Sequence, residues 1–319
     1  MREGRAGSVA AQAVTAGAVS VAMWGSLPML RALTELPAML TTAVAMGAAS
    51  STAAFLALIK GEWHPRRHPK SDRASAGRGA GAAGRLASET RLAAIQWAYW
   101  LGGVGGLLGA MFLYFSALAL GDPARITLVT YVWPIGFIVA VKRMHALPVG
   151  LPVFAGAALA FTGIVPLITS NATGVATPML AYVAGIASGG CWIAFSLYLR
   201  HAPALGFGGY ARLFLHAAVV AAALYALSGG LGTTGPLDWF AAAAIGFGPY
   251  GIAFMSWGFA LRRGPSGVLG ILNYFVPIIA ALLLILFGRS EPQPALFVAA
   301  AAVVGGSLLA SQGRPRRAR

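Results

Sequence analysis

The chain repeats part of itself. Residues 121–163 align without a gap onto residues 264–306, at an offset of 143 residues. Eight of the 43 aligned positions are identical, and they include Tyr131 and Pro134 with their counterparts in the second copy. Each copy carries Tyr-x-x-Pro near the middle of an apolar run, then a polar break, then a second apolar run. The sequence therefore predicts two related halves with the same order of structural elements.

The apolar runs are long enough to cross a lipid bilayer. Residues are 58% hydrophobic and only 10% charged, a composition typical of an integral membrane protein. With about 20 apolar residues per crossing, the sequence predicts an all-α protein with ten transmembrane helices. The predicted spans are residues 9–30, 36–59, 92–120, 124–141, 147–169, 178–199, 207–229, 239–261, 265–288 and 293–311.

The positive charges predict how these spans are oriented. Twenty of the 23 Lys and Arg residues fall on one side of the ten spans, and only Arg31, Arg125 and Arg289 fall on the other. Lys and Arg are enriched in cytoplasmic loops, so both termini are predicted to be cytoplasmic. The composition, rich in Ala, Gly and Arg, indicates a bacterial gene and hence the inner membrane.

The net charge of +15 is explained by this topology and does not predict a nucleic-acid partner. Residues 61–91 form the longest predicted loop, which is cytoplasmic and basic. This loop either binds anionic membrane lipid or only sets the topology.

Each half contains five predicted spans, so the second half enters the membrane from the opposite side to the first. We expect a five-helix repeat in residues 1–170 and a second repeat, inverted in topology, in residues 171–319. Tyr131 and Tyr274 then become symmetry mates in the fourth helix of each half. Membrane chains built from such repeats are typical of transporters, which bind substrate near the bilayer midplane and rock one half against the other.

A proline interrupts the fourth helix of each half. Proline lacks an N–H and clashes with the carbonyl four residues earlier, so Pro134 and Pro277 are predicted to free the carbonyls of Thr130 and Asn273. An unpaired carbonyl costs several kcal/mol in hydrocarbon, so both positions should face the protein interior or a wet cavity. Either the prolines only kink the helices, or the freed carbonyls accept a hydrogen bond from a substrate ammonium.

Aromatic side chains in the predicted helices form a candidate wall for an apolar or aromatic substrate. Trp and Tyr also gather at the two membrane interfaces, which is the alternative role for each of them. The deeper residues are favoured, and Tyr99 and Trp100 are retained because they share a helix face with Gln96 and Gly103. The predicted substrate-binding residues are Trp24, Tyr99, Trp100, Thr130, Tyr131, Trp133, Trp192, Trp257, Asn273 and Tyr274.

No Asp or Glu is predicted deep in any span, although proton-driven carriers commonly use intramembrane carboxylates or histidines. His216 is the candidate for proton coupling because a histidine titrates near neutral pH; alternatively it satisfies a local hydrogen bond. The missing carboxylates favour a zwitterionic or neutral solute. The sequence predicts no catalytic residue, metal site or cofactor, because no cluster of His, Asp, Glu or Lys lies at one depth.

Several motifs resemble the drug/metabolite transporter (DMT) superfamily, whose EamA-type members carry two five-helix repeats with a Tyr/Ser-Pro element in each fourth helix. Residues 130–134 read Thr-Tyr-Val-Trp-Pro, which is similar to the Tyr-Leu-Trp-Pro element of the aromatic amino acid exporters of YddG type. Residues 23–26 read Met-Trp-Gly-Ser and resemble the Trp-Gly element of the first helix, and Trp192 occupies the matching place in helix six.

The resemblance implies an exporter of aromatic and other neutral amino acids that works by alternating access, with or without proton coupling. One alternative is an exporter of another small metabolite or drug with the same fold. A second, from another class, is a membrane-embedded enzyme or a lipid-handling protein. The substrate range, the energy source and the oligomeric state are not determined by the sequence.

Overall fold

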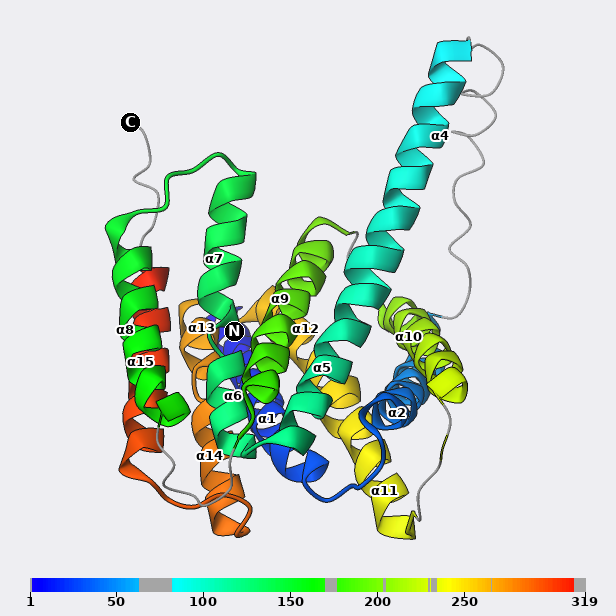
Figure 1. The fold of residues 1–319 in the computed structure, drawn as a ribbon. Helices are drawn as coiled ribbons and strands as arrows, with labels where there is room; N and C mark the ends of the chain where they lie inside the picture. Colours follow the sequence, from blue (N-terminus) through cyan, green and yellow to red (C-terminus); the bar gives the residue numbers. More distant parts are fainter. Residues whose placement is uncertain are drawn as a thin grey trace.

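The computed structural model describes residues 2–62, 82–169, 177–202, 205–228, 230, 234–264 and 266–312. Within these ranges the chain is helical and contains no strand, and Figure 1 shows the helices gathered in one bundle. Residues 63–81 of the predicted basic loop, the boundary between the two halves at residue 170, and residues 313–319 lie outside the described residues.

Eight helices in the described part of the chain are long and apolar enough to cross a membrane: Val9–Arg31, Ala38–Ile59, Thr90–Leu120, Pro123–Met144, Met179–His201, Phe207–Ser228, Pro236–Ala260 and Pro294–Ser311. Two shorter apolar helices, Leu151–Pro166 and Val276–Leu286, lie where the fifth and ninth spans are predicted. The all-helical membrane class is therefore confirmed, while the inverted arrangement of ten spans stays a prediction.

The elements follow one another along the chain in a regular order. The first half holds α1 (Arg2–Arg31), α2 (Ala38–Ile59), α4 (Ala82–Trp97), η1 (Ala98–Gly105), α5 (Gly106–Leu120), α6 (Pro123–Thr130), α7 (Trp133–Met144) and α8 (Leu151–Thr169). The second half holds α9 (Met179–His201), α10 (Phe207–Ser228), α11 (Pro236–Ile245), η2 (Gly246–Ile252), α12 (Ala253–Arg263), α13 (Ser266–Asn273), α14 (Val276–Leu286) and α15 (Pro294–Ser311).

The third and fourth helices of both halves are irregular. The segments η1 and η2 are π-helical and interrupt the third helix of their half. The fourth helix breaks after Thr130 in the first half and after Asn273 in the second, and in each case a proline is the second residue of the helix that follows. Thr130 and Asn273 are the pair that the sequence repeat aligns, so both breaks fall at the same repeat position.

Proline and aspartate fix two helix starts at one end of the bundle. Asp122 accepts a hydrogen bond from the backbone N–H of Arg125 at 2.8 Å, and Pro123 occupies the first turn of α6. Asp238 likewise accepts from the backbone N–H of Gly235 at 2.8 Å at the start of α11. Such caps satisfy N–H groups that an isolated helix end leaves unpaired.

Close helix pairs join the two halves. Three pairs, α2 with α10, α5 with α9, and α8 with α15, pack along much of their length. Where α8 crosses α15, Gly156 and Gly306 meet so closely that a methyl group on either would overlap the backbone carbonyl of the other. Small residues at a crossing allow two backbones to approach in lipid, so this contact depends on the absence of both side chains.

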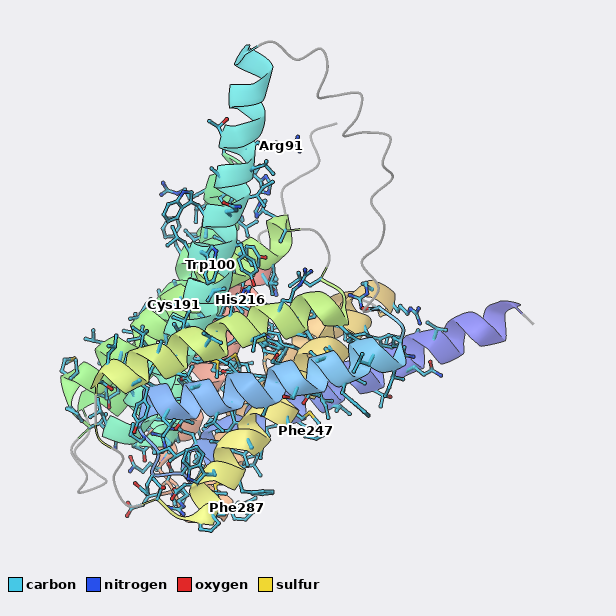
Figure 2. The ribbon with its side chains drawn as sticks, turned by 90° about the vertical axis from the view of Figure 1, so that its right-hand side faces the viewer. Arg91, Trp100, Cys191, His216, Phe247 and Phe287 are labelled. Atoms are coloured by element: carbon cyan, nitrogen blue, oxygen red, sulfur yellow. The ribbon has the colours of Figure 1, made fainter. Side chains whose placement is uncertain are left out.

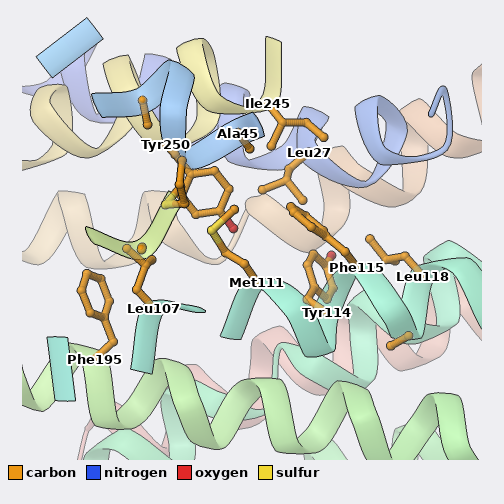
Figure 3. Close-up of a cluster of buried hydrophobic side chains, with 14 of the residues drawn as sticks. Leu27, Ala45, Leu107, Met111, Tyr114, Phe115, Leu118, Phe195, Ile245 and Tyr250 are labelled. Atoms are coloured by element: carbon orange, nitrogen blue, oxygen red, sulfur yellow. The ribbon is translucent and has the colours of Figure 1, made fainter. Parts of the chain in front are cut away.

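The buried core lies between α1, α2, α5, α9 and η2. Figure 3 shows Tyr250 of η2 and Met111 of α5 pointing toward one another, with Leu27 and Phe115 close by. Tyr250, Met111 and Phe115 are almost completely buried. The segment η2, which carries part of the cavity wall described below, packs chiefly against α2, and its Tyr250 side chain reaches toward α5.

The helix α4 projects beyond the rest of the bundle, as Figure 1 shows. The candidate span that begins in it, Thr90–Leu120, has 31 residues. At about 1.5 Å per residue this span is roughly 45 Å long, which exceeds the ~30 Å hydrocarbon core of a bilayer. Trp97, near the end of the projecting part, is 65% exposed.

We expect that replacing Gly156 by valine lowers the thermal midpoint of the protein in detergent, because the new side chain collides with the backbone of α15. Overpacking of this kind typically costs about 1–3 kcal/mol. Gly47→Val is the matched control, since nothing lies within 4 Å of a side chain added there. Equal midpoints for the two variants would show that the contact between α8 and α15 does not limit stability.

Candidate functional site

A cavity of about 540 Å³ opens among the helices of both halves. A volume of this size is typical of sites for small molecules. It is lined by Trp24, Leu27, Tyr114, Thr130, Tyr131, Trp133, Phe137, Trp192, Phe195, Ser196, Leu199, Arg200, Leu205, Tyr210, Tyr250, Phe254, Trp257, Gly258, Arg262 and Asn273.

Stacked aromatic rings form one wall of the cavity. The ring of Phe254 lies 5.6 Å from that of Tyr250 and 6.0 Å from that of Trp192, in nearly parallel planes. Trp192 and Tyr250 are also parallel, with centroids 6.3 Å apart. Because aromatic rings pack favourably in offset stacks and at their edges, this wall is suited to a planar, apolar group.

Trp24 and Trp257 extend the aromatic wall. The two rings meet edge to face at 5.3 Å, and Trp24 also meets Phe254 at 5.7 Å. The Nε1–H of Trp24 donates to the backbone carbonyl of Pro249 at 2.8 Å. Pro249 lies within η2, so the irregular helix supplies the acceptor that fixes the orientation of this indole ring.

Two polar side chains line the cavity beside the helix breaks. Thr130 is 3% exposed, and its Oγ1 atom has no hydrogen-bond partner among the described residues. Asn273, the last residue of α13, is half-buried and lines the same cavity. An unpaired buried hydroxyl is costly, and this one packs against α9, where a methyl group placed on Gly185 would lie 3.0 Å from Oγ1.

Arginines mark one end of the cavity. Arg200 lies in the last turn of α9 and Arg262 in the last turn of α12, and both side chains are exposed. None of the described residues that line the cavity is an Asp or a Glu. The cavity therefore runs from the helix breaks to helix ends that carry positive charge.

The opposite end of α6 is tied to the connection between α14 and α15. Ser290 Oγ donates to Asp122 Oδ2 at 3.1 Å, and Arg125 Nη2 donates to Gln293 Oε1 at 3.1 Å. All four residues are at most 9% exposed. These contacts join the two halves in a buried polar network on the side away from Arg200 and Arg262.

Seven of the ten predicted substrate-binding residues line the cavity, namely Trp24, Thr130, Tyr131, Trp133, Trp192, Trp257 and Asn273. The other three predicted residues, Tyr99, Trp100 and Tyr274, are not part of its lining. The hydroxyl of Tyr274 instead donates to the backbone carbonyl of Ser307 at 3.2 Å. Pro134 and Pro277 also lie outside the lining; Pro134 follows Trp133, which belongs to it, and Pro277 lies four residues after Asn273.

Tyr99 and Trp100 meet His216 where η1 packs against α10, as Figure 2 shows for Trp100 and His216. The hydroxyl of Tyr99 lies 2.7 Å from His216 Nδ1, and the indole of Trp100 stacks on the imidazole at 5.2 Å. His216 is not among the residues that line the cavity. Its contacts correspond to the local hydrogen bond that the sequence left open as the alternative to proton coupling.

The sequence did not indicate several residues of the wall, including Phe254, Phe195, Phe137, Tyr210 and the two arginines. A signal was present on α12, where Phe254, Trp257 and Arg262 recur at the spacing of one helix face. Tyr250, one turn before Phe254, continues the same face.

Residues 176–312 match the family model described as the EamA-like transporter family. The chain is 33% identical over 218 residues to the aromatic amino acid exporter YddG of Ancylobacter novellus. This alignment covers 67% of the chain and 76% of the exporter. A solved crystal structure superimposes with a TM-score of 0.65 at 27% identity, over 94% of this chain and 98% of the other.

A helical membrane bundle around a solute-sized cavity is typical of a transporter. The chain belongs to the EamA-like transporter family, within the DMT superfamily, as the comparisons with the family model and the exporter show. It is thus a multi-pass membrane transporter and not an enzyme.

Two threonines on α6 allow the role of the unpaired hydroxyl to be tested. We expect Thr130→Val to leave the thermal midpoint unchanged or higher, because it removes a polar atom without a partner, and to raise the KM for transport. Thr127→Val is the control for stability, since Thr127 Oγ1 lies 2.8 Å from the hydroxyl of Tyr114. Loss of this hydrogen bond should lower the free energy of unfolding by about 1–3 kcal/mol. A large loss of stability in Thr130→Val, with unchanged KM, would contradict this role.

Proposed function

We propose that this transporter exports aromatic and other neutral amino acids across the bacterial inner membrane. The observation that carries the proposal is the cavity wall of stacked rings from Trp192, Tyr250 and Phe254, with Thr130 and Asn273 placed to orient a polar group. Aromatic side chains bind an aromatic solute by stacking and by edge contacts. The relative from Ancylobacter novellus, described as an aromatic amino acid exporter, supports the same substrate class.

We further propose that the two halves are inverted five-helix repeats that alternate access to the cavity. The helix breaks after Thr130 and Asn273 fall on aligned positions, and each third helix contains a π-helical segment. Broken helices near the substrate are a recurring feature of transporters with such repeats. Residues of the fourth helix from both halves line the same cavity, which lets a movement of one half against the other change its opening.

The conformation described here corresponds to the cytoplasm-open state under this proposal. By the distribution of Lys and Arg, the ends of α9 and α12 with Arg200 and Arg262 are cytoplasmic, as are both termini. The cavity reaches these ends. The buried contacts of Asp122 with Ser290 and of Arg125 with Gln293 then close the periplasmic side.

Uptake of radiolabelled tryptophan, phenylalanine and lysine into proteoliposomes tests the proposal. We expect saturable uptake of both aromatic amino acids. Trp192→Ala should reduce it at least about tenfold, because the substitution removes part of the stacked wall. Trp239→Ala is the matched control, since Trp239 is 40% exposed and its Nε1–H donates to Thr234 Oγ1 outside the cavity. Absence of saturable uptake of both aromatic amino acids would contradict the proposed substrate class and favour the alternative, another small metabolite or drug.

We expect that replacing His216 by glutamine does not change the dependence of flux on an imposed pH gradient. The imidazole lies outside the cavity lining, and Tyr99 and Trp100 contact it. The same proteoliposomes, with and without a pH gradient, provide the measurement. A gradient effect that disappears in His216→Gln would instead identify this histidine as the coupling residue.

A further inference from the structure

One face of α12 lines the cavity with side chains that change from aromatic to positively charged along the helix. Phe254, Trp257, Gly258 and Arg262 all line it, and their spacing places them on the same side of the helix. At about 1.5 Å per residue, Arg262 lies roughly 12 Å along the helix axis from Phe254. The face therefore passes from a half-buried aromatic ring to a cation at the cytoplasmic end over a distance suited to one small solute.

Gly258 lies next to the guanidinium group of Arg262. A methyl group placed on Gly258 would lie 3.5 Å from Arg262 Nη1 and 4.0 Å from the hydroxyl of Tyr210. Tyr210 also lines the cavity. The guanidinium of this exposed residue thus lies close to Gly258 on the preceding turn of α12, on the side of the Tyr210 hydroxyl.

The neighbouring Arg263 differs in its surroundings. Its guanidinium lies 4.9 Å from the centroid of the Phe259 ring, and it is not among the residues that line the cavity. Both arginines have the same place in the topology, at the end of α12. A role of Arg262 in binding can therefore be separated from the contribution of positive charge to membrane orientation.

We propose that Arg262 binds the carboxylate of the transported solute, and that the substrate class is aromatic carboxylates, whether or not they carry an α-ammonium group. The proposal rests on the transport function proposed above. A guanidinium group offers paired donors that match a carboxylate. The described cavity residues include no acid that would bind an ammonium with comparable strength, and apart from Arg200 and Arg262 their polar side chains are neutral.

Competition against uptake of radiolabelled phenylalanine separates the two polar groups of the solute. The competitors are tryptophan, 3-indolepropionate, which lacks the ammonium, and tryptamine, which lacks the carboxylate. In the unmodified protein we expect half-maximal inhibition by 3-indolepropionate within about threefold of that by tryptophan, and by tryptamine at least about tenfold higher.

Variants assign the effect to Arg262. In Arg262→Gln the half-maximal concentrations of both carboxylates should rise about tenfold, so that the preference over tryptamine is lost. Arg262→Lys should retain part of the preference for the two carboxylates over tryptamine. Arg263→Gln should show the same half-maximal concentrations as the unmodified protein. Gly258→Leu retains Arg262 and Arg263 but places a large side chain beside the guanidinium and in the cavity lining. Its readout is therefore the ratio between tryptamine and the two carboxylates, which should fall as in Arg262→Gln.

The outcomes distinguish the two proposals. Equal inhibition by all three competitors, or the same loss in Arg262→Gln and Arg263→Gln, would overturn the assignment of Arg262 while the transport of aromatic amino acids stands. No saturable uptake of phenylalanine or tryptophan by the unmodified protein would overturn the transport proposal and the assignment with it.

Discussion

Backbone hydrogen bonding in a medium without water is the constraint on which the rest of this structure depends. Within hydrocarbon, irregular backbone is tolerated only where protein or a wet cavity satisfies it. The fold departs from regular helix in η1, in η2 and at the two breaks after Thr130 and Asn273. Three of these four places adjoin the cavity: Thr130 and Asn273 line it, and η2 supplies both Tyr250 and the carbonyl that orients Trp24. Three of the four irregular places thus contribute to the candidate site, and η1 does not.

Most of the fold could be predicted because an apolar run that must span a bilayer has few alternatives to a helix. All ten predicted spans coincide with helical segments, with ends that differ by a few residues. The breaks were indicated by Pro134 and Pro277, whose effect on a helix is local and strong. The π-helical segments were not predicted. Pro249 lies inside η2, but a proline indicates an interruption of the helix and does not specify π-helical pairing.

The site was predicted less completely, and the aligned tyrosines show why. Tyr131 lines the cavity while its counterpart Tyr274 bonds to Ser307 on α15. A sequence repeat makes two positions equivalent, but a cavity open at one end surrounds them differently. Tyr99 and Trp100 share a helix face in the sequence, and that face meets His216 on α10 and not the cavity. Periodicity identifies which residues lie together on a helix, and only the packing decides what they face.

The distribution of tryptophan has a spectroscopic consequence. The chain has eight tryptophans, and four of them, Trp24, Trp133, Trp192 and Trp257, line the cavity. Trp97, Trp100 and Trp239 are exposed on the bundle. Indole emission shifts to shorter wavelengths in apolar surroundings and is quenched by small ions that reach the ring. The emission of the four cavity rings therefore reports whether water and ions enter the cavity.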